Sequence, residues 1–483
     1  MKKTLALLLA LLLLLPTLAA CAEKPAQTDP TETAETADTP DENSRPMHNV
    51  PQKSFRGAAF TMISYGQIDS MFADDWTGET MNDAVYKRQT AVEDYLDVDI
   101  GYDIVDGIKA VHPAVQQSVL ASDDQYQLVL THCIAGNASL VTDNLLYDFE
   151  MLPVVDFDAD WWNLPQMDRL RLGEKYYYGV SDTVIPFPYA IFFNRDILDE
   201  YQMDDPYTLV YNGTWTLDKY LDMASAAKRD LNGDGQMDRQ DLFGMGCGEG
   251  SRFISFITGS GQYLTGRSTE TDRIELVCNT EKMQKLIELF ARAAQQDGMI
   301  RPFENEDMDT LGPDFESGHI LFCLDSIGAV KGYAGYDIGL GLVPYPKYDE
   351  AQENYLSLDW GGLMSVPVTI RDPEMVGSVL ELMAYLSEET VIPAYFTKTL
   401  DGRYARDVDM RNMIHLLFDT ITYETGGNYF GFDGSFMRLF YAISELAIAD
   451  KSTNYASLYK KYSKTVNNML KDFYKKLSKN EMQ

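Results

Sequence analysis

Residues 79–104 read ETMNDAVYKRQTAVEDYLDVDIGYDI, and the spacing of their hydrophobic side chains changes once along the stretch. Over 79–96 the spacing is three or four residues, which predicts a helix whose inner face carries Met81, Val85, Arg88, Val92 and Tyr95. Over 98–104 hydrophobic and polar residues alternate, which predicts a strand directly after the helix. A strand-like run at 58–64 precedes both. The order strand, helix, strand is typical of a mostly parallel sheet.

The same order continues along the chain. The sequence predicts a helix over 113–121 and strands over 126–131, 175–180, 189–194, 320–325, 338–343 and 363–368. Two further helices are expected to begin after Thr216 and Thr280, because a threonine side chain can cap the first free amides of a helix. We therefore expect an α/β protein.

The chain after Pro373 is predicted to be mainly helical. Its last helix carries an apolar stripe and, around it, a basic face formed by Lys460, Lys461, Lys464, Lys471, Lys475 and Lys476. Such a face can lie on a membrane surface, but we expect it to be a solvated face on an acidic body.

The composition limits the classes of protein that are possible. The 483 residues include 40 Lys and Arg against 74 Asp and Glu, which gives a formal net charge of −34. This charge argues against nucleic-acid binding, because it repels phosphate. The 30 Tyr and 22 Phe exclude an acidic disordered chain. The length suits two or three domains.

The N-terminus has the features of an export signal. Lys2 and Lys3 precede an apolar run at 5–15, and small residues lead to Cys21, so we predict a signal peptide over 1–20. The alternative is a single membrane anchor, for which the run is short. The sequence Leu-Ala-Ala-Cys before residue 22 resembles the lipobox of bacterial lipoproteins, which implies a lipid on Cys21. Residues 21–56 are rich in Pro, Thr and acidic residues and are predicted to be a disordered tether.

Four other cysteines are widely spaced and form no Cys-x-x-Cys pair; they are Cys133, Cys247, Cys278 and Cys323. We expect buried free thiols, and the sequence leaves one long-range disulfide open.

Four segments resemble, in their order and spacing, the extracellular solute-binding proteins of ABC importers, in the sugar-binding group called family 1. They are YAIFFNR at 189–195, WTLD at 215–218, FESGHILFCLD at 315–325 and DIGLGLVPYP at 337–346. The likeness covers nearly the whole chain after the signal, although no single motif in it is strict. It implies a two-lobed periplasmic-binding-protein-like fold of type II, with ligand held between the lobes.

The resemblance also implies a division of the chain. An N-terminal α/β lobe would span 57–185 and be completed by part of 345–483. A second α/β lobe would span 186–345, and 346–483 would form the hinge return and helices that pack on both lobes. Crossovers are expected near 182–189 and 344–360.

Residues 230–241, DLNGDGQMDRQD, have the spacing of a calcium loop. Calcium takes about 6–8 oxygen ligands, and a glycine at position 6 allows the sharp turn. The predicted ligands are Asp230, Asn232, Asp234, Gln236 (through its carbonyl), Asp238 and Asp241. An EF-hand would have Glu at the last position and a second helix, so the loop is more similar to the isolated loops of dockerins and of some members of this binding-protein family. We expect a structural calcium ion; the alternative is an acidic surface turn.

The ligand site is expected in loops after the carboxyl ends of strands. Sugars are bound by aromatic faces together with side chains that hydrogen-bond to hydroxyl groups. The candidates are Tyr65, Asp75, Trp76, His132, Asp182, Arg252, Phe253, Asp325, Trp360 and Gly361. Trp76 and Trp360 are the strongest, because each lies in a polar loop. Trp161 and Trp162 could reach the cleft or belong to the core, and Trp215 is expected to pack at a helix start.

No catalytic signature is present: the chain lacks H-E-x-x-H, G-x-S-x-G and the phosphate-binding loop, and its five histidines are scattered. We therefore expect no enzyme but a lipid-anchored solute-binding protein, monomeric, on the outer face of the cell membrane. It would capture a carbohydrate, an oligosaccharide in particular, by hinge closure and deliver it to the permease subunits of an ABC importer. The alternatives are a secreted carbohydrate-active enzyme and a ligand-sensing module for a membrane receptor.

Overall fold

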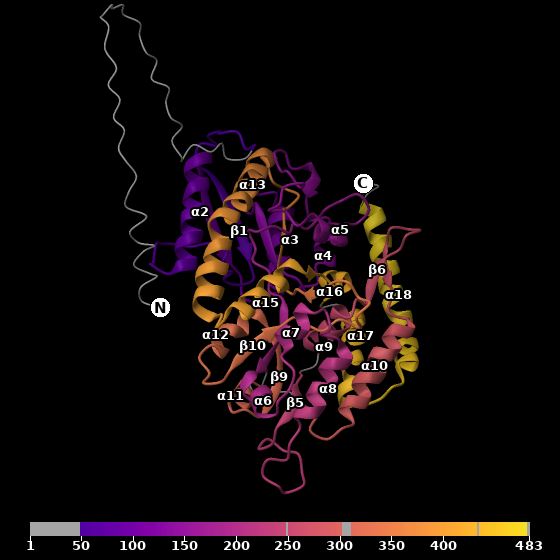
Figure 1. Ribbon diagram of the computed structural model, residues 1–483. Coiled ribbons are helices and arrows are strands. Elements are labelled where there is room, and N and C mark those ends of the chain that lie inside the picture. Colours follow the sequence, from indigo (N-terminus) through magenta and orange to yellow (C-terminus); the bar gives the residue numbers. More distant parts are fainter. Residues whose placement is uncertain (1–48, 248–249, 302–310, 432–433, 481–483) are drawn as a thin grey trace, which may run out of the picture. The chain divides into compact units, whose positions relative to one another are not determined.

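The structure is a computed structural model that describes residues 49–247, 250–301, 311–431 and 434–480 (Figure 1). The predicted signal peptide, Cys21 and most of the predicted tether lie outside these residues. The described residues belong to one compact unit of the chain. No helix among them combines the length and the apolar character that a membrane crossing requires.

The first sheet has four strands in the order β12-β3-β1-β2. Strand β1 is parallel to β2 and β3, whereas β12 is antiparallel to β3. Helix α2 connects β1 to β2, and α3 connects β2 to β3, so the predicted strand–helix–strand order is confirmed. The bounds are β1 Ala58–Ser64, α2 Thr80–Leu96, β2 Val98–Ile104, α3 Val111–Ala121, β3 Leu128–His132 and β12 Gly362–Ser365.

The second sheet has five strands in the order β10-β4-β9-β5-β8. Strand β4 is antiparallel to both of its neighbours, and β5 is parallel to both of its own. This sheet is therefore mixed, not mostly parallel. The bounds are β4 Tyr189–Asn194, β5 Phe243–Gly246, β8 Ile300–Arg301, β9 Ile320–Ser326 and β10 Leu340–Val343.

Short helices and one hairpin connect these strands. In the first part they are α4 Ala138–Thr142, η1 Phe149–Met151 and α5 Leu164–Leu170. Around the second sheet they are α6 Arg195–Glu200, α7 Pro206–Tyr211, α8 Leu217–Ala227, α9 Ser251–Gly259, β6 Thr265–Arg267, β7 Ile274–Leu276, α10 Glu281–Ala294, α11 Leu311–Glu316, η3 Ile327–Ala329 and α12 Val330–Tyr333.

The helix starts follow from their capping residues. The side chain of Thr280 accepts the amide of Met283 at 3.0 Å and begins α10, and Thr216 caps α8 in the same way. At the start of α2 the Glu79 carboxylate accepts the amides of residues 81 and 82, both at 2.9 Å. These caps satisfy amides that have no partner within the helix.

The strand predicted over 175–180 does not form. Its residues make only isolated bridges, Leu172 with Lys175 and Gly179 with Met364. The ring of Phe149 lies so close to Gly179 that a Cβ there would be 2.7 Å from its Cε1 atom. The segment is therefore held by this packing and by scattered backbone hydrogen bonds, such as that from the amide of Phe149 to the carbonyl of Tyr176 at 2.8 Å, instead of a continuous ladder.

The chain crosses between the two sheets at three places that lie side by side. Pro188 on the first crossover forms an antiparallel bridge with Asp359 on the second. Strand β11 (Ser357–Leu358) of the second crossover is parallel to β13 (Ile421–Thr422), which belongs to the C-terminal part. The hinge region therefore contains three hydrogen-bonded segments.

The C-terminal part is mainly helical, as predicted. Helix α13 packs on α2 beside the first sheet, α15 packs against β10 and α7, and α18 contacts α4, α10 and β7 (Figure 1). The bounds are α13 Pro373–Glu389, α14 Val391–Pro393, η4 Ala394–Tyr404 (a π-helix), α15 Val408–Asp419, α16 Thr425–Phe430, α17 Gly434–Ser444, η5 Glu445–Ala449 and α18 Tyr455–Asn480.

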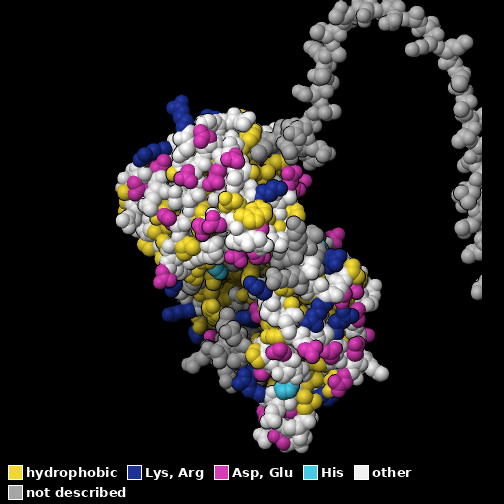
Figure 2. Space-filling model, turned by 90° about the vertical axis from the view of Figure 1, so that its left-hand side faces the viewer, with side chains coloured by type: hydrophobic (Ala, Val, Ile, Leu, Met, Phe, Trp, Pro, Cys, Tyr) yellow, Lys and Arg dark blue, Asp and Glu magenta, His cyan; other side chains and the backbone are white. Residues whose placement is uncertain are grey.

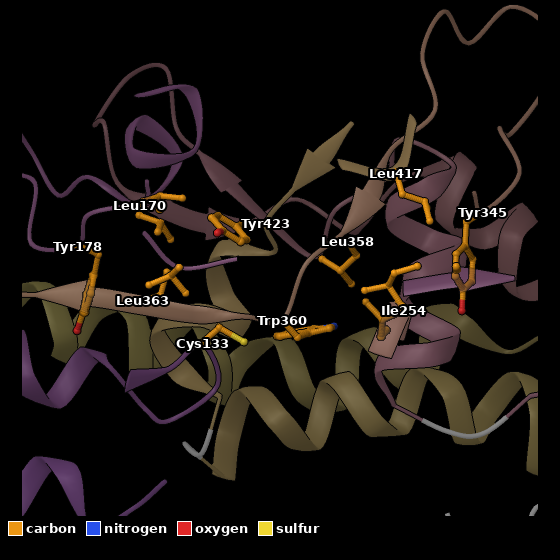
Figure 3. Packing of buried hydrophobic residues seen from close by; sticks show 14 of the residues in the cluster. Cys133, Leu170, Tyr178, Ile254, Tyr345, Leu358, Trp360, Leu363, Leu417 and Tyr423 are labelled. Atoms are coloured by element: carbon orange, nitrogen blue, oxygen red, sulfur yellow. The ribbon is translucent and has the colours of Figure 1, made fainter. Parts of the chain in front are cut away.

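One hydrophobic cluster extends through both sheets and the crossovers. Figure 3 shows Tyr178 and Leu363 beside the first sheet, Ile254 and Tyr345 beside the second, and Trp360 between them. The crossovers are thus packed into the core. This packing fixes the positions of the crossover side chains that lie between the two sheets.

Candidate functional site

A cleft of about 850 Å³ lies where the two sheets and the crossovers meet. It is lined by the loop after β1, the end of β3, the first and second crossovers, the turn after β9 and the π-helix η4. The carboxyl ends of the parallel strands β1 and β3 point to it, which is where α/β proteins bind ligands. Figure 2 shows the hollow between the two parts of the body, with hydrophobic side chains inside it.

Six aromatic side chains from four separate segments line the cleft: Tyr65, Phe72, Phe187, Trp360, Tyr395 and Tyr404. Some are held by neighbouring rings, since Phe72 stacks on Tyr102 with a centroid distance of 5.4 Å. The polar side chains between them are Gln67, Asp69, Ser70, Glu79, Asn82, His132 and Lys331. Flat apolar faces with a few polar groups between them suit a ligand that has both C–H faces and hydroxyl groups.

His132 and Tyr65 form an edge-to-face pair with ring centroids 5.5 Å apart. The Nδ1 atom of His132 accepts the amide of Ile134 at 3.2 Å, so the proton of the neutral ring lies on Nε2. Burial lowers the pKa of His132, and burial also raises the pKa of Tyr65 to about 12. Near neutral pH both side chains are therefore uncharged hydrogen-bond donors.

The indole ring of Trp360 is held by its packing, and its N–H group has no hydrogen-bond partner within the described part of the chain. The indole packs edge-on against Phe440 at 5.7 Å, and a Cβ at Gly427 would lie 2.6 Å from its Cη2 atom. Its Nε1 atom is buried and has no hydrogen-bond partner among the described residues. An unpaired buried N–H costs about 1–3 kcal/mol.

The neighbouring Asp359 links the crossovers. Its buried carboxylate accepts the amide of Phe187 at 2.5 Å, together with the amides of Trp360 and Gly361 and the hydroxyl of Tyr423. Burial is the largest effect and raises the pKa of Asp359 to about 6. One carboxylate thus holds the three hinge segments together directly beneath the cleft.

Four of the ten predicted ligand residues line the cleft: Tyr65, His132, Trp360 and Gly361. Asp75 and Trp76 belong to the loop before α2 and are not among the lining residues. The Asp75 carbonyl accepts from the side chain of Asn82 at 2.6 Å, and Trp76 is 62% exposed and meets Tyr86 edge-on.

Asp182 lies at the start of the first crossover and is not among the lining residues either. Its amide donates to the carbonyl of Trp161 at 3.0 Å. Burial, followed by the charge of Glu388, raises the pKa of Asp182 to about 7.

Arg252 and Phe253 are buried in the second part, and Asp325 is half-buried there. Arg252 pairs with Asp325 at 3.0 Å and donates to the carbonyl of Leu324 at 2.9 Å, and Tyr333 donates to the same carboxylate. Phe253 is fully buried against Phe290, with ring centroids 5.0 Å apart. The ion pair satisfies polar groups within the lobe, and Phe253 packs between α9 and α10, so none of the three lines the cleft.

The other tryptophans belong to the core. Trp161 and Trp162 both donate from Nε1 to the buried carboxylate of Glu381, at 3.1 and 2.8 Å. Trp215 is fully buried and donates to the carbonyl of Pro344 at 2.8 Å, at the start of α8. The four cysteines of the described residues are buried and form no disulfide with one another, as expected.

Several lining residues were missed by the sequence reasoning. Gln67, Ser70 and Phe72 follow β1 directly, in the same loop as Tyr65, so their place after a parallel strand is a signal that the sequence contains. Tyr395 and Tyr404 come from a π-helix far along the chain, and no local pattern marks them as cleft residues.

The predicted calcium loop forms a closed turn between α8 and β5, bridged at its base by Arg229 and Leu242. The Asp230 carboxylate accepts the amides of Gly233 and Gly235, and buried Asp241 accepts those of residues 231 and 238. The donor types suit a hard cation. However, no group of three His, Cys, Asp or Glu side chains in the described part of the chain is arranged to hold a metal ion. Calcium binding here stays a prediction.

No family model and no curated protein sequence matches the chain. Solved structures do match. An ABC substrate-binding protein from Listeria monocytogenes, in complex with cycloalternan, is 11% identical; the match covers 87% of this chain and 99% of that chain, with a TM-score of 0.56. A cyclo/maltodextrin-binding protein complexed with maltotetraose is 14% identical, with 88% and 97% covered and a TM-score of 0.57.

A third match is the galacto-N-biose/lacto-N-biose I-binding protein of an ABC transporter from Bifidobacterium longum, in complex with lacto-N-biose. It is 13% identical, with 86% of this chain and 98% of that chain covered and a TM-score of 0.58. At these identities the likeness concerns the fold. The chain has the two-lobed α/β fold of ABC sugar-binding proteins, and the predicted fold class is confirmed.

Proposed function

We propose that this protein, whose fold is that of ABC sugar-binding proteins, captures a carbohydrate in the cleft and delivers it to the permease of an ABC importer. The observation that carries the proposal is the lining of the cleft, in which six aromatic rings lie among polar side chains and Tyr65 and His132 are neutral hydrogen-bond donors. Sugar rings present C–H faces to aromatic rings and hydroxyl groups to such donors.

The ligand class that we propose is an oligosaccharide. A volume of about 850 Å³ is at the upper end of the usual range of roughly 300–1,000 Å³ for small-molecule sites. The aromatic rings come from segments spread around the cleft, so several sugar units could each meet one ring. The matching proteins of known structure were solved with cycloalternan, maltotetraose and lacto-N-biose, which supports the same class.

The proposed mechanism is closure about the hinge. The cleft takes Tyr65 and His132 from the first lobe and Ile327 and Lys331 from the second. A ligand that touches both sets favours the state in which they are near each other, and so shifts the population toward the closed form. The hinge segments that would rotate are the ones that Asp359 holds together.

A thermal-shift screen over neutral oligosaccharides tests the proposal. We expect at least one member to raise the melting temperature of the protein, and to lose this effect when Tyr65 and Trp360 are both replaced by Ala. The matched control is Trp76→Ala, which removes an exposed ring outside the cleft and should leave the shift unchanged. A panel without any stabilising member would contradict carbohydrate capture.

We propose a binding protein and not an enzyme, in keeping with the matching structures, which are binding proteins. Chromatography of the best ligand after long incubation with the protein tests this. Recovery of the intact ligand is expected, and release of a smaller sugar would favour the carbohydrate-active enzyme.

We further propose that a lipid on Cys21 holds the protein at the outer face of the cell membrane. The support is the sequence of the N-terminus, with its predicted signal and lipobox-like run. Detergent phase partitioning of the expressed protein should place it in the detergent phase, and Cys21→Ser should move it to the aqueous phase.

A calcium ion in the loop 230–241 is a separate structural proposal. Asp230, Asn232 and Asp234 would hold it with the carbonyl of Gln236 and the carboxylates of Asp238 and Asp241, and its charge would offset these acids. The support is the ligand spacing and the closed turn.

A further inference from the structure

Helix α18 has one face in the core and one that is strongly basic. Its buried stripe carries Val466, Leu470, Phe473 and Leu477. The exposed face carries seven lysines over the length of the helix: Lys460, Lys461, Lys464, Lys471, Lys475, Lys476 and Lys479. Asp472 is the one acidic residue among the 26 of the helix. The apolar stripe therefore holds the helix on the body, and the charged face is exposed. Figure 1 shows α18 at the edge of the body.

These lysines are not neutralised by the body. Acidic residues outnumber basic ones by 74 to 40 in the chain, yet no ion pair within the described residues joins a lysine of α18 to a carboxylate. Lys461 instead makes a cation–π contact with its neighbour Tyr462, with Nζ 4.9 Å from the centre of the ring. The positive charge of the face is thus available to an outside partner.

We propose that the lysine face of α18 lies on an anionic lipid surface, with its ammonium groups against headgroup phosphates. A helix of 26 residues is about 39 Å long at roughly 1.5 Å per residue, so the face is an extended strip that can meet a flat surface. Juxtamembrane clusters of lysines are attracted to anionic leaflets. The inference rests on the proposed location of the protein beside a membrane.

The composition of the face favours lipid over a protein partner. Protein interfaces are enriched in arginine and aromatic residues and depleted of lysine, whereas this face has no arginine. The apolar side of α18 is buried in the body, so the helix cannot insert, and the contact should be electrostatic. Screening over about 10 Å at 0.1 M salt limits the repulsion from acidic groups elsewhere on the body.

Co-sedimentation with vesicles tests the inference, with the mature chain carrying Cys21→Ala so that no lipid anchor contributes. We expect binding to vesicles of phosphatidylcholine with phosphatidylglycerol, little binding to phosphatidylcholine alone, and loss of binding at high salt. Lys460→Gln, Lys464→Gln and Lys471→Gln together should weaken binding at least tenfold.

The matched control replaces three lysines elsewhere, Lys53, Lys87 and Lys285, by Gln, and should bind as the parent does. Both triple variants should keep the parent melting temperature and the same response to oligosaccharides, so that failure of lipid binding and failure of sugar binding are separate results. Absence of binding to anionic vesicles at low salt, or equal loss in both triple variants, would overturn the inference. Binding to a soluble acidic polypeptide but not to anionic vesicles would also overturn it, in favour of a protein partner.

Discussion

Among single residues, Trp360 has the most direct role in the proposed site. Its ring is fixed by Phe440 and Gly427, and its Nε1 atom has no partner among the described residues. Trp360→Phe keeps an aromatic face and removes the N–H, so we expect a loss of affinity of about one hydrogen bond, roughly 0.5–1.5 kcal/mol, or about two- to twelvefold. Calorimetric titration with the best oligosaccharide measures this. Affinity equal to that of the parent would show that the indole N–H does not contact the ligand.

A second prediction at the same scale concerns Asp359 and pH. Its pKa is raised from an ordinary 3.8 to about 6, so the folded state binds this proton more tightly than the unfolded state does. The contribution to stability is therefore fully present below pH 4 and is lost as pH rises to about 6. Such a shift corresponds to a change of up to about 3 kcal/mol.

Urea unfolding of the parent and of Asp359→Asn between pH 4 and pH 7 measures the effect. The free energy of unfolding of the parent should fall over this range relative to that of the variant. Asp182, whose pKa is also raised, remains in both proteins and cancels in the comparison. A constant difference across the range would contradict the assignment.

At the scale of elements, the helix starts and most strands could be predicted because they depend on nearby residues. Thr280 caps α10 through a bond that spans three residues, and the alternation in β2 lies within one strand. The strand predicted at 175–180 was wrong, because a strand needs a partner ladder, and the packing of Gly179 on Phe149 is visible only in the fold.

The loop 230–241 gives the element-scale prediction. If it binds calcium, chelation with EDTA should lower the melting temperature of the parent, because bound metal stabilises the folded state by mass action. Asp234→Ala should lower the melting temperature in the absence of EDTA and remove the response to it. As a control, Asp204→Ala changes an exposed acid outside the loop and should keep the response. A melting curve of the parent that EDTA leaves unchanged would argue against calcium.

At the scale of the whole molecule, the site could be predicted only in part. Tyr65 and His132 were found because they follow parallel strands, and the carboxyl ends of such strands meet at one edge. Arg252 instead lies in the first turn of α9 and Asp325 lies within β9, where the two form an ion pair and do not line the cleft. Tyr395 and Tyr404 reach the cleft through tertiary packing, which no local pattern encodes.

Hinge closure gives a prediction for both lobes together. A bound ligand should slow amide hydrogen exchange at 65–72 in the first lobe and at 327–331 in the second to a similar degree, because closure holds both segments against it. Hydrogen-exchange mass spectrometry with and without the best oligosaccharide measures this. Protection confined to one lobe would contradict capture between the lobes.

The most direct test of the central claim is calorimetric titration of the mature protein with its best oligosaccharide, compared with the variant in which Tyr65 and Trp360 are both Ala. The account predicts saturable binding of one ligand per chain and no detectable heat with the variant, while Trp76→Ala binds as the parent does. Equal binding by the parent and the double variant would show that the cleft is not the carbohydrate site.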